Sequence, residues 1–346
     1  MADLTSLTSP LAGQVRRWWR AISSERGVST VIFALVLPAV MGMQALVVDG
    51  TRLFVERRAL QNAADAAALA AAIYLPSTDP VVLTRARDAA IEYAGMNGYE
   101  ISAGDVTFSS DATDNDRVTV HTGAEVEFFM AGGFGISLGS VSSRGAAQIG
   151  TVGGLGGVMP WGVEEPEGGF VFGAEYCLKM GSGGGGGQCS EANQGNFQAL
   201  DIDDTGTSSS DEYRDRIRWG SHTTVRIGQV KSVSTGNMQG PTQQGTGCSG
   251  SNGRVTGNSS TFEQVVEADG DDYRVLDWSN SRLILIPVVV FPEAHQALVT
   301  GFAAFFLEAC GPNGSVTGRF IDTVVPGGEW ATFQPGVGTR AVRLVE

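Results

Sequence analysis

The sequence predicts an α+β protein with a long N-terminal transmembrane and amphipathic helix, a small helix-hairpin plus β module, and a mainly antiparallel β exterior domain. Three observations predict this class. The segment Val28–Val48 is apolar and uncharged, the segment Asp49–Tyr74 is rich in alanine, and the rest of the chain is rich in glycine. Long apolar and alanine-rich segments form helices, whereas short alternating segments between glycine-rich turns form strands.

The length and the charge of the chain limit its class. Its 346 residues are enough for about two or three domains, and its net charge is −14. Acidic and basic residues balance through Glu100, so the later part of the chain carries the whole excess. An acidic surface is repelled by phosphate backbones, and we therefore expect no nucleic-acid partner. Such a surface keeps an exported domain soluble.

The segment Val28–Val48 predicts a single membrane-spanning helix. At about 1.5 Å per residue it is long enough to cross a hydrocarbon core of about 30 Å. Pro38 lies in its middle and would kink the helix without preventing insertion. A cleaved secretory signal is the rival interpretation. The segment is longer than a usual signal core, and no small-x-small cleavage site follows it.

The flanking charges favour one orientation only slightly. Four arginines precede the span (Arg16, Arg17, Arg20 and Arg26), and three follow it closely (Arg52, Arg57 and Arg58). The large cysteine-bearing part downstream favours a cytoplasmic N-terminus, because disulfides form outside the cytoplasm. We therefore expect a single-pass protein of the cytoplasmic membrane, with membrane lipid as one partner and the bulk of the chain on the exterior or periplasmic side.

The alanine-rich segment Thr51–Tyr74 continues the helix without a loop signal. Its small residues recur at helical spacing and form a smooth packing face with two leucines: Leu53, Leu60, Ala63, Ala67 and Ala71. Asp79 with Pro80 predicts the start of a second helix, which runs to roughly Ala94. An antiparallel helix hairpin within the chain is the favoured cover for the face, and a seam with another protein is the alternative.

Four strands are expected after the two helices, at residues 106–108, 117–122, 124–129 and 141–149. The domain plan that follows is a leader over residues 1–27, the transmembrane helix over 28–48, the helix hairpin plus β module over 49–150, and the exterior domain over 151–346. The glycine-rich stretch 150–160 is expected to be a linker or an irregular first strand.

The exterior domain is expected to be built from strands joined by long loops. Strand candidates are residues 169–172, 223–227, 282–291, 297–307, 315–325 and 341–345, and short helices are expected at 211–218 and 262–267. The segments 282–291 and 297–307 are almost continuously apolar, which is typical of strands buried on both faces.

The four cysteines, Cys177, Cys189, Cys248 and Cys310, all follow the predicted span. Three pairings are possible, and Cys177–Cys189 with Cys248–Cys310 is favoured. A metal site is the alternative, but it would need tighter cysteine pairs or histidine partners. The three histidines are scattered along the chain, so structural disulfides are the preferred interpretation.

Two weak metal candidates are present. Asp277, Ser279 and Ser281 form a D-x-S-x-S sequence, which is typical of von Willebrand A-type metal sites when it lies between a strand and a helix. Here an apolar strand candidate follows, and the motif is interpreted as a turn. Asp201, Asp203 and Asp204 gather oxygen ligands that calcium prefers, but without EF-hand spacing.

No cofactor or small-molecule substrate is evident from the sequence. The glycines after residue 180 lack the Lys-Ser/Thr end of a phosphate loop, and no nucleophile–base set rises above chance. We therefore expect a protein that is not an enzyme, and we assign no catalytic, cofactor-binding or metal-binding residues.

The N-terminal motifs carry a resemblance to a known family. The sequence RGVSTVIFALVLPAVMGMQALVVDGTRLFVERRALQNAADAAALAAA resembles the N-terminal segment of TadE/TadG-like Flp (tight-adherence) pilus-assembly proteins over roughly residues 26–75. The marks are Arg26-Gly27, Pro38, Val48-Asp49, Arg52, Arg58 and the Leu60–Ala70 run. The section AEVEFFMAGGFGISLGSVSSRGAAQIG resembles the end of the same module.

The resemblance implies a non-enzymatic, pilin-like or minor-pilin-like envelope protein that takes part in assembly or anchoring of the pilus. Its implied partners are other pilus-assembly components or pilins. Processed pilins of the broad family carry Glu five residues after the cleaved glycine, whereas this chain has Ile32. The departure implies that the chain stays in the membrane as an assembly factor.

Two other classes of function stay open at this point. One is a membrane-anchored adhesin or ligand-binding β domain, unrelated to pilus assembly, for which the helix is only an anchor. The other is a membrane-tethered hydrolase, which the absence of a recognisable nucleophile–base set disfavours.

Overall fold

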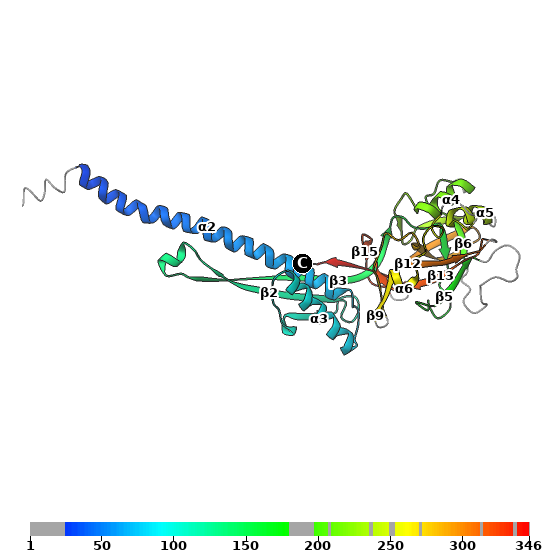
Figure 1. The fold of residues 1–346 in the computed structure, drawn as a ribbon, viewed down its shortest axis with the longest axis horizontal. Helices are drawn as coiled ribbons and strands as arrows, with labels where there is room; N and C mark the ends of the chain where they lie inside the picture. The colour runs from blue at the N-terminus through cyan, green and yellow to red at the C-terminus, as the bar shows by residue number, and fades with distance from the viewer. Residues whose placement is uncertain are drawn as a thin grey trace, which may run out of the picture.

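The structure is a computed structural model that describes residues 25–179, 197–206, 209–234, 238–248, 253–269, 272–311, 314–334 and 338–345. Most of the predicted leader lies outside these residues. One long helix, α2, extends from a body of two β layers (Figure 1). The predicted α+β class is confirmed.

Helix α2 spans Glu25–Ala72 without a break and contains Pro38. The expectation of one helix through the apolar and alanine-rich segments is therefore confirmed. Within the described ranges, α2 is the one helix long and apolar enough to cross a membrane. Its large apolar side chains before Asp49 are exposed, and most of its alanines after residue 60 are buried.

A second helix and a long hairpin pack beside α2. Helix α3 spans Pro80–Met96, and its N-cap Asp79 accepts a hydrogen bond of 2.8 Å from the Val81 amide. A 3-10 turn, η1 (Ala103–Asp105), leads into β1 (Val106–Ser109), which pairs with β2 (Arg117–Glu127). The two strands expected at 117–122 and 124–129 form one strand, because Gly123 continues the ladder with β3 (Leu138–Leu155).

Strand β3 is the long central strand of the first sheet. Its first part pairs with β2, and its second part pairs with β16 (Thr339–Leu344), β15 (Glu329–Ala331) and β7 (Val225–Arg226). β14 (Thr323–Val324) completes this sheet beside β16. Residues 150–155, expected as a linker or an irregular first strand, continue β3. The chain therefore returns from its C-terminal part to the sheet that holds α2.

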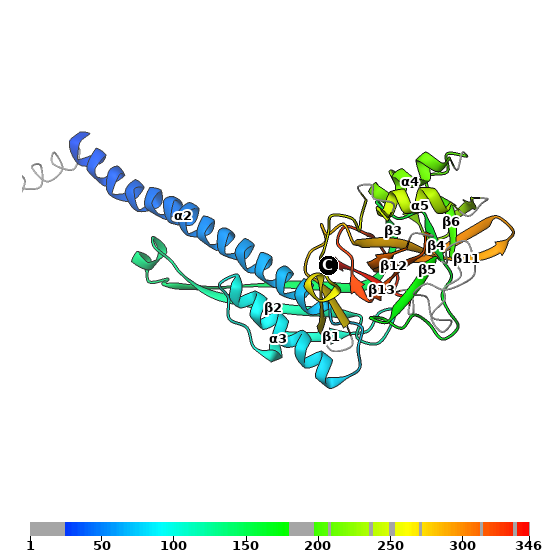
Figure 2. The same cartoon turned by 45° about the vertical axis from the view of Figure 1, so that its right-hand side comes forward.

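The second sheet forms the body at the far end of the molecule (Figure 2). β11 (Leu283–Glu293) and β12 (Gln296–Cys310) are its long central hairpin, as the apolar segments predict. β4 (Trp161–Val163), β6 (Phe197–Asp201) and β8 (Val230–Val233) connect the two edges of that hairpin and close a ring. β13 (Val316–Ile321) and β5 (Glu175–Lys179) extend the sheet.

The remaining elements are short. α4 (Ser210–Trp219) lies where a helix is expected, and α5 (Gln239–Thr246) is a helix that the sequence pattern does not reveal. The expected helix at 262–267 is divided between α6 (Phe262–Val265) and β9 (Val266–Asp269), which pairs with β10 (Asp272–Val275). The strand expected at 169–172 is wrong, because Gly168 and Gly169 have φ values of 95° and 85° and turn the chain there.

The two layers have different cores. Alanines of α2 and α3 pack with Val118, Val120, Ala147 and Ile149 in the helical layer. The second sheet is filled by aromatic and branched side chains, including Trp161, Phe305 and Phe320. The helical layer is thus held by many small contacts, whereas the second sheet buries large apolar areas.

Candidate functional site on the N-terminal helix

The predicted packing face of α2 is largely covered by the chain itself. Leu60, Ala63, Ala67 and Ala71 have no exposed surface, whereas Leu53 is partly exposed. The cover comes from β2, β3 and α3 together. Because β2 and β3 cross the face as well, the helix hairpin expected from the sequence is only part of the cover.

Gly145 explains how a strand can approach α2 so closely. A Cβ atom at this position would overlap the backbone of Ala64 and Asp65. Alanines on the helix and glycine on the strand therefore allow backbone-to-backbone contact. Polar bonds add to it: the Thr122 hydroxyl donates to the Leu60 carbonyl over 3.1 Å, and the Gln61 amide donates to the Arg144 carbonyl over 3.0 Å.

Asp49 fastens the tip of the β2–β3 hairpin to the helix. Its carboxylate, 4% exposed, accepts hydrogen bonds from the backbone amides of Phe129, Met130 and Ala131, with shortest distances of 2.9, 3.1 and 2.7 Å. The Met130 and Ala131 amides lie at the N-cap and first position of the short 3-10 helix η2 (Ala131–Phe134), whose first donors would otherwise lack partners. Asp49 is the first charged residue after the uncharged segment, so the bond lies at its end.

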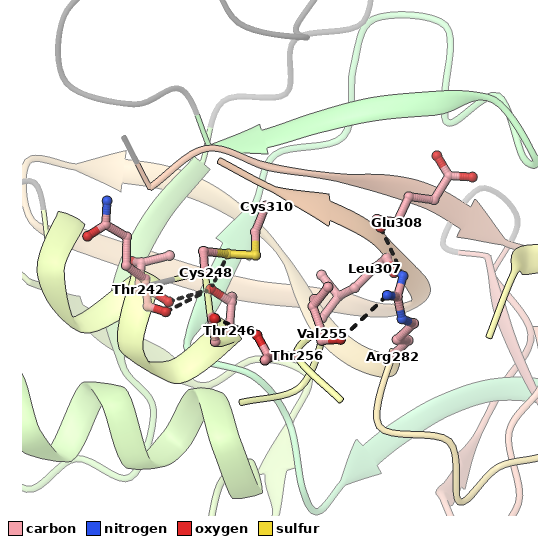
Figure 3. Close-up of a disulfide and its surroundings, with 11 residues drawn as sticks. Thr242, Thr246, Cys248, Val255, Thr256, Arg282, Leu307, Glu308 and Cys310 are labelled. Carbon is pink, nitrogen blue, oxygen red and sulfur yellow. Dashed lines mark hydrogen bonds between the residues drawn. A yellow bond between two sulfur atoms is a disulfide. The ribbon is translucent and has the colours of Figure 1, made fainter. Parts of the chain in front are cut away.

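The structure describes three of the four cysteines. Cys248, just after α5, and Cys310, at the end of β12, form a disulfide with a Cα–Cα distance of 5.7 Å (Figure 3). This half of the favoured pairing is confirmed. Cys177 on β5 is disulfide-bonded as well, and Cys189 lies outside the described residues. The bond at Cys248 ties α5 to the central hairpin, where Arg282 donates to the Glu308 carbonyl over 2.9 Å.

The three clustered aspartates do not converge on one point. Asp201 accepts hydrogen bonds from the Thr205 and Gly206 amides, and Asp204 pairs with Lys231 over 2.7 Å. Asp203 instead holds the Thr223 hydroxyl and the Arg216 guanidinium. Among the described residues, no group of His, Cys, Asp and Glu is arranged to hold a metal ion.

Local hydrogen bonds set the charge state of Asp203. Burial raises the pKa of its carboxyl. Hydrogen bonds from the Thr223 hydroxyl and from the His222 and Thr223 amides, together with the charge of Arg216, lower the pKa by more than burial raises it. Its pKa therefore lies below the ordinary value. The adjoining cavity is about 10 Å³, room for about one water. Burial raises the pKa of the neighbouring Tyr213 to about 12, and its hydroxyl accepts a hydrogen bond from Trp161.

The D-x-S-x-S residues lie in the turn between β10 and β11. The Ser279 hydroxyl donates to Asp277 over 2.6 Å, whereas the Ser281 hydroxyl donates to the Arg254 carbonyl over 2.8 Å. The motif precedes a strand instead of a helix, so it lacks the context of the von Willebrand A-type site.

Sequence reasoning missed two residues that shape this site. Gly145 gives no local signal, because its role depends on a helix far away in the sequence. Asp49 had a signal that was not used: a lone carboxylate directly after an uncharged span needs a partner. The uncharged turn between β2 and β3 was a second unused signal.

Comparison with protein families identifies α2 as the segment that carries the family relation. Residues 27–73 match the family model Tad, described as putative Flp pilus-assembly TadE/G-like. This segment contains both the uncharged half and the alanine half of the helix, and the match confirms the resemblance there. Searches of curated proteins and of solved structures found no match. The Tad match supports a role in Flp pilus assembly.

Proposed function

We propose that this chain is a non-enzymatic, single-pass envelope protein that takes part in the assembly or anchoring of a Flp pilus. The observation that carries the proposal is that the Tad match coincides with α2. The matched helix has one half suited to lipid and one half built into a folded body. That combination favours an anchored assembly factor over a freely exported domain.

The first half of α2 supports the anchoring part of the proposal. Its large apolar side chains are exposed on every side of the helix, including Leu35 at 72% and Leu46 at 77%. Such a surface is costly in water and favourable in a bilayer. We place residues 28–48 in the cytoplasmic membrane, the leader 1–27 in the cytoplasm, and the body (module 49–150 and domain 151–346) on the exterior side.

The polar groups of the body support the non-enzymatic part. The carboxylates with lowered pKa values, such as Asp116 and Asp203, are held by backbone amides and side chains of the chain itself. Such groups stabilise loops and turns, and those two have no free acceptor directed at a substrate-sized cavity. Within the described residues, this is the pattern of a structural body.

Contacts with other pilus components are proposed for the exposed apolar side chains of α3. The alanine face of α2 is occupied by its own module, so it is not offered to a partner. By contrast, Val81, Tyr93 and Met96 on α3 are 61%, 43% and 72% exposed. Apolar side chains on one exposed helix are the more suitable surface for a pilin or another assembly component.

The test uses cells that assemble a Flp pilus and lack this chain. We expect the wild-type chain to restore surface pili and a Met96→Cys variant to form crosslinks with identified pilus components. A control with cysteine at Thr107, which is exposed on β1, should give few such crosslinks. Normal piliation without the chain would contradict the proposed role.

The rival function is a membrane-anchored ligand-binding domain. A groove of about 250 Å³ between the two helices and strands β10, β14 and β16 favours it, because Tyr74, Tyr93, Tyr273 and Arg340 line the groove. Exchange of residues 28–48 for an unrelated transmembrane helix separates the two functions. Surface binding that survives the exchange, in cells whose piliation never depended on the chain, would favour the rival.

A further inference from the structure

The turn at the end of the β2–β3 hairpin lies beside the membrane end of α2. We call residues 128–138 the hairpin tip. Both views place it alongside α2, on the side away from the second sheet (Figures 1 and 2). The hydrogen bonds from Phe129, Met130 and Ala131 to Asp49 fix its height along the helix.

The tip reaches past the last charged position into the uncharged part of α2. Ala45 lies one turn before Asp49, about 6 Å along the axis. It is only 6% exposed, while its neighbour Leu46 is 77% exposed. The tip contacts α2 through η2, next to the hydrogen bonds at Asp49. The hairpin therefore ends beside residues that the proposed anchor places in the bilayer.

The composition of the tip suits lipid. No charged residue occurs from Phe128 to Ser143. Three of its large apolar side chains point into solvent: Phe129 is 73% exposed, Ile136 58% and Leu138 52%. Such side chains gathered at the end of a long hairpin would be costly in water, and they are the residue types that bury in an interfacial region.

Charged residues around the tip limit the depth of insertion. Glu125 and Glu127 are exposed on β2 just before the tip, and carboxylates stay in water or among headgroups. On α2, Arg52 is exposed one turn after Asp49, where its guanidinium can reach lipid phosphates. The geometry allows a shallow contact at the boundary between headgroups and acyl chains.

We infer that the hairpin tip is a second membrane contact, with Phe129, Ile136 and Leu138 buried in the leaflet from which α2 emerges. The inference rests on the proposed membrane span of α2, because the span sets the level of the bilayer. Its occupant is lipid. Two points of attachment, the span and the tip, fix the tilt and rotation of the body over the membrane, which a single span fixes less well.

The experiment uses the full oxidised chain in vesicles of phosphatidylethanolamine and phosphatidylglycerol. A fluorophore is attached at cysteine in Ile136→Cys, and quenching by lipids with a shallow nitroxide is compared with quenching by aqueous iodide. The matched control is Val81→Cys, an exposed apolar position on α3. Leu46→Cys reports the span. All three side chains are exposed, so the substitutions leave the packing intact.

The expected result is strong lipid quenching at Leu46 and at Ile136, several-fold above that at Val81, with Ile136 protected from iodide. Iodide access at Ile136 equal to that at Val81, with Leu46 still quenched by lipid, would overturn the inference and leave the anchor intact. Protection from iodide without lipid quenching would mean that protein covers the tip, which also overturns it. Loss of lipid quenching at Leu46 would refute the anchor itself.

Discussion

Both halves of α2 carry an apolar surface, yet what surrounds that surface differs. In the first half, the side chains are large and exposed, as at Leu46, which is 77% exposed. On the packing face of the second half they are small and fully buried, as at Ala63 and Ala67. Side-chain size therefore separates the uncharged half from the packing face of the second half better than hydrophobicity does. Large branched chains suit lipid, whereas alanines let a strand and a helix approach the backbone.

The largest expected effect is at the closest contact of the buried half. Gly145→Ala adds a methyl group where the Ala64 backbone leaves no room, so we expect a loss of stability near the upper end of the overpacking range, about 3 kcal/mol. Denaturant unfolding in detergent measures it. The control is Gly123→Ala, whose added Cβ lies 3.7 Å from its nearest neighbour. Equal effects of the two substitutions would contradict close packing at Gly145.

The same substitution in each half tests the comparison directly. Ala67→Leu overpacks a fully buried site and should cost about 2 kcal/mol of unfolding free energy. Ala39→Leu adds the same atoms at an exposed position in the uncharged half and should leave the unfolding midpoint unchanged. A large loss of stability at Ala39 would mean that protein, and not lipid, surrounds the first half.

The boundary between the halves depends on Asp49. Asp49→Ala removes the acceptor of three backbone amides, and we expect amide exchange at Phe129, Met130 and Ala131 to become several-fold faster. Asp65→Ala is the matched control, because Asp65 accepts a hydrogen bond from Gln61 on the same helix. Unchanged exchange at the tip would show that contacts other than Asp49 hold the hairpin to α2.

Acid should lower the stability of the module that covers the second half of α2 and leave the uncharged first half unchanged. Burial raises the pKa of Asp116, but the Ala112 and Asp111 amides, Gln148 and the Thr113 amide lower it below its ordinary value. A lowered folded-state pKa stabilises the module above the unfolded value, about 3.9, and this contribution is lost as the pH falls through the lower folded value.

We expect the unfolding midpoint of the module to fall over this acidic window and the fall to be smaller in Asp116→Asn. The uncharged half from Val28 to Val48 has no titratable side chain, so its helix content should not change. Identical acid profiles for Asp116→Asn and the wild type would contradict a contribution of ionised Asp116 to the stability of the module.

The sequence was sufficient for features that are encoded locally. The uncharged segment and the alanine repeat predict α2, Asp79 with Pro80 predicts α3, and the apolar segments predict the β11–β12 hairpin. These signals lie within one element, where period and capping residues determine the structure.

Features that depend on distant pairing could not be predicted in this way. Strands such as β4 and β8 are only a few residues long and form because partners far along the chain supply their hydrogen bonds. The close contact at Gly145 and the cover over Ala45 likewise come from a hairpin that follows α2 by many residues. The sequence predicted which residues of α2 form the packing face. It did not predict that strands β2 and β3 help to cover that face.

The most direct test of the central claim measures what surrounds each half of α2. Nitroxide labels at Leu35, Leu46 and Arg58, all exposed, are compared in reconstituted vesicles for collision with oxygen and with a water-soluble nickel chelate. The account predicts oxygen access without nickel access at Leu35 and Leu46, and nickel access at Arg58. Equal nickel access at all three positions would contradict the division of the helix into a lipid half and a body half.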